Sequence, residues 1–263
     1  MTQLEVPVGD GILLVERRGA GLPILFIHGW GLSHLAWAPQ QTALRQDFQT
    51  ISWDRRGFGR STAPFDQERE LADILAISTA LGLEKFVIVG MSQGCRIAVH
   101  FALKYPDRVA GLVVQGSPLS SSVPAFATEA EIPIDLLIDL AIKADLPRLR
   151  AIWREHPLLA VADQNGRKIL DSIVSSYCAE DLKGRREQLP LTQKLASMLA
   201  VPTVVLVGER ESEYRKWAAS ALAEAIQGAD LVRIERGGHL CNLCNPVSYN
   251  AVLTTFMTAR ASF

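Results

Sequence analysis

The sequence has little net charge and no long hydrophobic run. Lys and Arg number 27 and Asp and Glu number 28, which gives a formal net charge of −1. This balance argues against a nucleic-acid-binding surface. The basic runs at residues 55–56 and 183–186 are short, and we interpret them as solvated or structural charges. No apolar run reaches the roughly 18 residues of a membrane span. We therefore expect neither a nucleic acid nor a membrane as partner.

Cysteine is also scarce, and no basic segment followed by an apolar one precedes the first expected strand. Such a segment is typical of a secretory signal, so we expect a cytoplasmic protein with reduced thiols. Of the four cysteines, Cys241 and Cys244 have the C-x-x-C spacing of some metal and redox sites. They lack a second ligand pair at a suitable spacing, so we interpret them as structural and expect no metal.

What the chain does contain is an alternation of apolar strand-like runs with helical patterns. Its 263 residues, 48% of them hydrophobic, suffice for one large α/β domain or two small ones. Residues 9–11, Gly-Asp-Gly, predict a hairpin turn. Strands are expected at residues 3–8, 12–17, 24–27, 49–53, 86–89, 109–114, 203–207 and 231–235. Helices are expected at residues 35–45, 67–81, 95–103 and 214–226, and from residue 246 onward.

The stretch at residues 90–94, Gly-Met-Ser-Gln-Gly, lies between an apolar β-branched run and a helical pattern. A serine on a glycine-flanked turn between strand and helix is typical of a nucleophile elbow. The turn is tight, its serine backbone is strained, and only glycine tolerates the crowding on either side. The helix N-terminus beneath it favours a developing negative charge. The alternative is an ordinary glycine-rich turn.

A second glycine-rich stretch, at residues 28–31, reads His-Gly-Trp-Gly and follows an apolar run. In the elbow architecture, one oxyanion donor is the residue after the nucleophile, and the other comes from the loop after the third strand. The backbone N–H groups of Gln93 and Trp30 are therefore the expected donors. We interpret His28 as a structural brace of this loop. Asp54 precedes the serine in the chain, and we interpret it as a brace of its own charged loop.

These stretches resemble the α/β-hydrolase superfamily, together with further ones at residues 54–61, 201–208 and 237–239. The resemblance covers residues 1–118 and 195–263. It implies an α/β-hydrolase fold, in which an eight-stranded, mostly parallel sheet has helices on both faces. It also implies a helical lid inserted after the sixth strand.

Residues 119–194 occupy the position of that lid. Apolar helical patches at residues 134–142, 149–153 and 169–177, without an alternating strand pattern, predict three or four short helices over the cleft. Packing between helices is the alternative role for each candidate pocket contact of this segment. These candidates are Leu140, Trp153, His156, Leu158 and Leu159.

The superfamily pattern after the seventh strand is Gly-x-x-Asp, in which the aspartate is the acid of a catalytic triad. This chain has Glu211 at that place, and a glutamate can also orient a histidine. Glu209 and Glu213 are the alternatives, and on the structural interpretation all three are solvated loop charges. His239 lies on a glycine loop after the last expected strand. The order Ser92, Glu211, His239 is the one that this architecture requires.

These residues predict a serine hydrolase that transfers an acyl group to water without a metal or organic cofactor. The expected substrate is a small or medium, mostly apolar carboxylic ester or lactone. Arg96, one turn into the helix after the serine, is expected to form a structural salt link. The expected pocket residues are Gly29, Trp30, Trp37, Phe58, Met91, Trp153, Leu158 and Leu240.

Other activities of the superfamily stay open, including amide, thioester and carbon–carbon bond cleavage and perhydrolysis. Carbon–carbon hydrolases of the superfamily often carry a tryptophan after the catalytic histidine, and Leu240 stands there instead. Dehalogenases and epoxide hydrolases use an aspartate at the elbow, which Ser92 excludes. A receptor of the same fold that binds a ligand with little turnover is a further alternative. The expected partner is a small-molecule substrate, and the protein is expected to be a monomer or homodimer.

Overall fold

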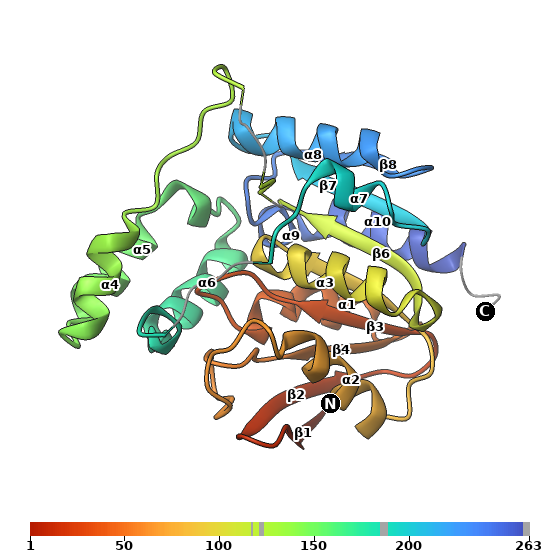
Figure 1. Cartoon of the computed structure of the whole chain (residues 1–263), viewed down its shortest axis with the longest axis horizontal. Helices are drawn as coiled ribbons and strands as arrows, with labels where there is room; N and C mark the ends of the chain where they lie inside the picture. The colour runs from red at the N-terminus through yellow and green to blue at the C-terminus, as the bar shows by residue number, and fades with distance from the viewer. Residues whose placement is uncertain (117, 121–123, 185–188, 260–263) are drawn as a thin grey trace.

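The computed structural model describes residues 1–116, 118–120, 124–184 and 189–259 (Figure 1). An eight-stranded sheet forms its centre, in the spatial order β1-β2-β4-β3-β5-β6-β7-β8. Strand β2 pairs antiparallel with both β1 and β4, and the other neighbouring pairs are parallel. The mostly parallel sheet is therefore confirmed. The strands are β1 (Thr2–Pro7), β2 (Ile12–Arg18), β3 (Pro23–Ile27), β4 (Gln49–Trp53), β5 (Phe86–Met91), β6 (Val109–Gln115), β7 (Thr203–Gly208) and β8 (Asp230–Ile234).

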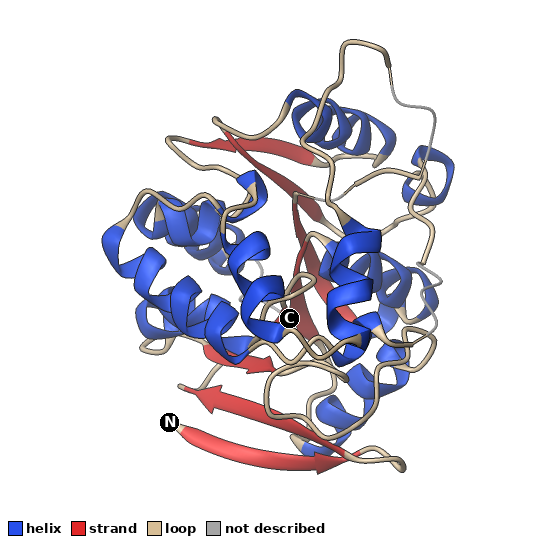
Figure 2. Ribbon diagram, turned by 90° about the vertical axis from the view of Figure 1, so that its left-hand side faces the viewer, coloured by secondary structure: helices blue, strands red, loops and turns tan. Residues whose placement is uncertain are grey.

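Helices cover both faces of this sheet (Figure 2), as predicted. Successive side chains of a strand point to opposite faces. In β3, Ile24 and Phe26 join one apolar cluster, whereas Leu25 and Ile27 join the other. The first cluster includes residues of α1 (Ala38–Leu44) and α10 (Pro246–Thr258), and the second includes residues of α2 (Glu70–Ala80), α3 (Gln93–Lys104) and α8 (Glu213–Ala225).

The helix expected at residues 35–45 is split in two. Ser33 caps a short 3₁₀ turn, η1 (His34–Trp37), and α1 then starts at Ala38. Pro39 lies in the first turn of α1. Because proline has no N–H, it cannot donate the hydrogen bond that a continuous helix needs at this position.

The described elements between β6 and β7 are α4 (Ile134–Ile142), α5 (Leu146–Arg154), η3 (Pro157–Leu159), α6 (Gln164–Ser176), η4 (Glu180–Leu182) and α7 (Gln193–Ala196). The helices α4, α5 and α6 lie to one side of the sheet, whereas the short α7 lies beside α8 (Figure 1). Asp163 begins α6 by accepting a hydrogen bond of 2.7 Å from the N–H of Gly166. Helices α4, α5 and α6 overlap the three predicted apolar patches. The division into core and lid at residues 119 and 194 stays a prediction.

Two short elements lie elsewhere: η2 (Pro106–Arg108) before β6 and α9 (Cys241–Cys244) before α10. In the part of the chain that the structure describes, no helix has both the length and the hydropathy needed to cross a membrane.

Candidate active site

Ser92 stands on the turn between β5 and α3, with a backbone conformation of φ 54° and ψ −116°. A non-glycine residue with positive φ is strained and persists only where its surroundings impose it. A Cβ on Gly90 would lie 2.5 Å from the carbonyl oxygen of Gly94, and one on Gly94 would lie 2.5 Å from that of Ile27. The predicted tight and strained turn, with glycine required on either side, is confirmed.

His239 and Glu211 meet at the carboxyl ends of two neighbouring strands. Glu211 follows β7 and His239 follows β8, and the two strands pair in parallel. The Nδ1 atom of His239 lies 2.8 Å from Oε2 of Glu211, and both residues are buried. The N–H of Ser212 donates to the other carboxylate oxygen of Glu211 over 3.0 Å.

The two alternative acids bind elsewhere. Oε2 of Glu209 accepts a hydrogen bond of 2.8 Å from the N–H of Arg236, and Glu213 forms an ion pair with Lys216 on the surface. Of the three candidate carboxylates, the structure brings Glu211 to the histidine. Burial opposes ionisation of Glu211, but the charge of His239 and the hydrogen bond between them outweigh it and lower the pKa of Glu211.

Sequence reasoning missed the residues that hold the His239 loop. The side-chain Nε2 of Gln115 donates to the carbonyl oxygen of His239 over 2.8 Å, and Nη1 of Arg215 donates to that of Gly116 over 2.5 Å. Gly116 has φ 61°, and a Cβ there would lie 2.8 Å from Cε1 of His239. The imidazole therefore packs directly against glycine backbone. The glycine two residues after the sixth expected strand was the available signal.

The loop with the expected oxyanion donors lies against the serine. A Cβ on Gly29 would be 3.2 Å from the Cβ of Ser92. Within the described residues, the backbone N–H groups of Trp30 and Gln93 donate no hydrogen bond. Their side chains form other hydrogen bonds: Trp30 Nε1 donates to Asp181 over 2.5 Å, and Gln93 Oε1 accepts from Arg55 over 3.0 Å. The use of the two N–H groups as an oxyanion hole stays a prediction.

His28 braces the same loop from within the core. Its Nε2 accepts a hydrogen bond of 3.0 Å from the N–H of Arg55, which fixes the proton on Nδ1, and Nδ1 donates to the carbonyl oxygen of Gly29 over 2.7 Å. Burial lowers the pKa of His28 to about 3, so the ring is neutral. The structural role expected for His28 agrees with these contacts.

Asp54 and its neighbours form a charged brace, as expected. Both the N–H and Nδ1 of His34 donate to Oδ1 of Asp54, over 2.9 and 2.7 Å. The two arginines that follow Asp54 pair with α2: Arg55 binds Glu70 over 2.5 Å, and Arg56 binds Asp73 over 2.7 Å. These four side chains are nearly inaccessible to solvent.

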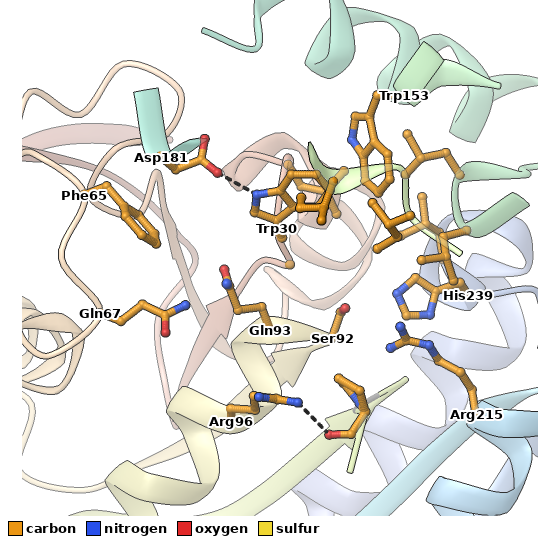
Figure 3. Close-up of a pocket in the computed structure, with 18 residues that line it drawn as sticks. Trp30, Phe65, Gln67, Ser92, Gln93, Arg96, Trp153, Asp181, Arg215 and His239 are labelled. Atoms are coloured by element: carbon orange, nitrogen blue, oxygen red, sulfur yellow. Dashed lines mark hydrogen bonds between the residues drawn. The ribbon is translucent and has the colours of Figure 1, made fainter. Parts of the chain in front are cut away.

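Ser92 and His239 line one cavity of about 300 Å³ (Figure 3). Four of the expected pocket residues beyond Trp30 lie on its wall: Gly29, Trp153, Leu158 and Leu240. The whole lining consists of Gly29, Trp30, Leu32, Phe65, Gln67, Ser92, Gln93, Arg96, Pro118, Ile132, Ile134, Trp153, Leu158, Leu159, Asp181, Arg215, His239 and Leu240.

The predictions for Trp37, Met91 and Phe58 as pocket residues are wrong. The ring of Trp37 packs against Phe26 at 5.0 Å and against Tyr249 at 6.2 Å in the core on one face of the sheet. Met91 ends β5 with its side chain inside the same core. Phe58 packs edge-on against the His28 ring at 5.3 Å. All three are buried in packing contacts instead of facing the cavity.

The salt link expected for Arg96 is not found among the described residues. Its guanidinium donates to the carbonyl oxygens of Leu189 and Pro118, over 3.1 and 3.3 Å, and no carboxylate among the described residues pairs with it. Asp181, another polar wall residue that sequence reasoning missed, accepts hydrogen bonds from Trp30 and from the Tyr177 hydroxyl. Burial raises the pKa of the Asp181 carboxyl.

The four cysteines form no disulfide within the described residues. Cys241 and Cys244 lie on α9, and burial raises the pKa of both. Over the described ranges, no group of three or more His, Cys, Asp or Glu side chains has an arrangement that could hold a metal ion.

Comparison with known proteins identifies this architecture. The family described as alpha/beta hydrolase fold matches residues 23–144. The AB hydrolase superfamily protein YisY of Bacillus subtilis is 29% identical over 241 residues, which cover 86% of this chain and 88% of YisY. A protein of Caulobacter segnis named "Putative carbamate hydrolase RutD" is 28% identical over 89% of this chain and 90% of its own. A solved thermophilic esterase of Thermogutta terrifontis superposes with a TM-score of 0.79 at 24% identity, over 99% of this chain and 100% of that one, which shows a shared fold.

Proposed function

Because the chain belongs to the α/β-hydrolase superfamily, we propose that it is a serine hydrolase that cleaves a small or medium carboxylic ester or lactone through an acyl-enzyme. One observation carries this proposal. The hydrogen-bonded pair of Glu211 and His239 opens onto the cavity that the strained Ser92 also lines. Ser92, His239 and Glu211 follow β5, β8 and β7, and we assign them as nucleophile, base and orienting acid.

In the first half of the reaction, His239 takes the hydroxyl proton of Ser92 as Oγ attacks the carbonyl carbon. Glu211 holds the imidazole in the required tautomer and stabilises its charged form. The carbonyl oxygen becomes negative and accepts hydrogen bonds from the N–H groups of Trp30 and Gln93. When the tetrahedral species collapses, the bond to the leaving oxygen breaks and that oxygen receives the proton from His239.

In the second half, water attacks the acyl-enzyme and gives its proton to His239. The new tetrahedral species uses the same two N–H donors, and its collapse releases the acid and returns the proton to Ser92. These steps need no group beyond the side chains and backbone named here.

A carbamate is the second candidate substrate class, since one relative's name refers to carbamate hydrolysis. A carbamate presents the same carbonyl carbon to the serine, so the machinery does not distinguish the two classes. Direct comparison of turnover for an ester, a lactone and a carbamate decides between them.

Labelling with a fluorophosphonate probe, followed by peptide mapping, tests the proposal. We expect one adduct on Ser92 in the wild type, no adduct in Ser92→Ala, and labelling at least 10³-fold slower in His239→Ala. His100→Ala is the matched control, because His100 is outside the cavity lining and contacts the carbonyl oxygen of Pro190. A folded wild type that gains no adduct contradicts the proposal and favours a receptor of this fold.

A further inference from the structure

Arg96 places a cation in the wall of the cavity close to the serine. It follows Ser92 by four residues and lies in the first turn of α3. Arg96 is only 7% exposed, and it lines the cavity together with Ser92 and Gln93 (Figure 3). The hydrocarbon part of any substrate bound there meets apolar walls, including Ile132, Ile134 and Leu158.

The charge of Arg96 has no counter-ion within the described chain. Two of its nitrogens donate to carbonyl oxygens, and Nε has no acceptor among the described residues. Burial lowers the pKa of Arg96, and the neighbouring Arg215 adds to this effect. Arg215 itself is neutralised, because it pairs with Glu129 over 2.5 Å. A buried cation without a partner is unfavourable unless something else supplies the negative charge.

Asp181, a carboxylate in the described wall of the cavity, does not neutralise Arg96 either. Its two oxygens accept hydrogen bonds from Trp30 and Tyr177, over 2.5 and 2.7 Å. In Figure 3, Asp181 lies beside Trp30, whereas Arg96 lies on the other side of Gln93. The two charges therefore belong to different ends of the cavity.

A second polar side chain on the wall is Gln67. It is 8% exposed, and its Oε1 accepts no hydrogen bond from the described residues. That oxygen suits a donor group of a ligand, whereas Arg96 supplies the positive charge that suits an anionic group. Arginine suits a carboxylate, because its planar donors match the two oxygens.

We propose that the acyl group of the substrate carries a carboxylate that Arg96 binds, so that the protein hydrolyses monoesters of short dicarboxylic acids or the corresponding carboxylated lactones. This proposal rests on the proposed serine-hydrolase function and names its substrate class. The cavity volume of about 300 Å³ restricts the acid to a short chain.

Two 4-nitrophenyl esters test it. One is the monoester of glutaric acid, and the other is the pentanoate, in which a methyl group replaces the free carboxylate. We expect the wild type to favour the glutarate ester at least tenfold in kcat/KM. Arg96→Gln should lower this ratio at least tenfold, and Arg96→Lys, which retains the charge, should lower it less. Arg108→Gln is the matched control and should leave the ratio unchanged, since Arg108 also donates to backbone carbonyls but lies outside the cavity lining.

A binding measurement tests the carboxylate-binding role of Arg96 independently of catalysis. Calorimetry should show glutarate binding to Ser92→Ala at least tenfold more tightly than to Ser92→Ala with Arg96→Gln. The proposal is overturned if both variants bind glutarate equally, if the wild type does not prefer the glutarate ester, or if Arg96→Gln leaves the kcat/KM ratio of the two esters unchanged. If that ratio is unchanged but the melting temperature of Arg96→Gln falls, Arg96 serves only to bind the carbonyl oxygens of Leu189 and Pro118. If Arg96→Gln does not fold, the wild-type ratio and Arg96→Lys decide.

The two proposals fail separately. If Ser92 is labelled and the wild type hydrolyses the pentanoate ester without preferring the glutarate ester, the serine-hydrolase proposal stands and the carboxylate-binding proposal is wrong. Absence of both labelling and turnover removes the hydrolase function itself.

Discussion

The loop after β4 and the cavity beside Ser92 both bury charged side chains, but their charges are balanced differently. In the loop, Arg55 pairs with Glu70, and Arg56 pairs with Asp73. In the cavity, Arg96 has no counter-ion among the described residues. Buried charges that are paired within the chain serve the fold, whereas an unpaired one is retained at a cost to stability. The paired charges of the loop thus stabilise the fold, whereas we propose that a ligand neutralises the charge of Arg96.

The two regions touch at Gln93. Nη2 of Arg55, whose charge Glu70 neutralises, donates to the side-chain oxygen of Gln93 over 3.0 Å. The brace thereby fixes the side chain of the residue whose backbone N–H is proposed to bind the oxyanion. Variants that test the comparison must therefore avoid the Arg55–Glu70 pair and use the Arg56–Asp73 pair instead.

The largest expected effect comes from Glu211→Gln. Without the carboxylate charge, the imidazole loses the group that fixes its tautomer and stabilises its protonated form, so kcat/KM should fall about 10³–10⁴-fold. Steady-state kinetics on an activated ester measures this loss. Glu209→Gln is the control, because Glu209 binds the N–H of Arg236 and not the histidine. A loss below tenfold in Glu211→Gln would mean that another group orients His239.

Asp73→Asn should do the opposite and damage the fold while sparing the chemistry. Removing the buried carboxylate leaves Arg56 with only the more exposed Asp10, 3.3 Å away, so the free energy of unfolding should fall by about 3 kcal/mol. Urea unfolding measures this change, and kcat on the folded fraction should stay within about twofold of wild type. A strong loss of kcat without loss of stability would show that the brace acts directly on the site.

An acidic shift of pH should destabilise the protein through His28. Its pKa is about 3 in the folded state and about 6.5 when unfolded, so between these values the unfolded chain binds a proton that the folded chain does not. Stability is intact above pH 6.5 and falls by up to about 1.4 kcal/mol per pH unit below it. Urea unfolding between pH 7 and 5 should show a shallower decline in His28→Gln than in wild type. His100→Gln should decline like wild type, and equal slopes in all three would remove His28 as the cause.

The smallest effect is expected for Asp181→Asn. The amide keeps one acceptor oxygen but cannot accept from both Trp30 and Tyr177, and one hydrogen bond is worth about 1 kcal/mol. If Trp30 shifts as a result, kcat should fall about fivefold with little change in the ratio between the glutarate and pentanoate esters. A change in that ratio as large as in Arg96→Gln would show that both charges act on the same substrate group.

Much of the fold and part of the candidate site could be predicted from sequence because their signals are local. Apolar runs mark the strands, and the glycines around Ser92 mark the turn that holds it. The wall of the cavity could not be predicted in the same way. Trp37 and Met91 are apolar residues near the right loops, yet their side chains point into the core, since strand alternation and ring packing decide their direction.

The charged wall residues escaped prediction for a different reason. Arg96 and Asp181 are polar residues of the kind usually found on the surface, and only the tertiary structure shows that one lacks a counter-ion and the other binds Trp30. Gln115 likewise contacts the loop of His239 across 124 positions of sequence. No pattern in the neighbouring residues reports such a contact.

The hydrogen bond between Trp30 and Asp181 has a spectroscopic consequence. The indole is joined to a residue 151 positions away and lies 4.5 Å from the Trp153 ring and 6.3 Å from that of Tyr177. Indole emission responds to a nearby carboxylate and to neighbouring rings, so any displacement of the helices between β6 and β7 changes the fluorescence of Trp30. The protein therefore carries an intrinsic fluorophore in the wall of its own cavity, and rapid-mixing fluorescence can follow ligand entry without an added dye.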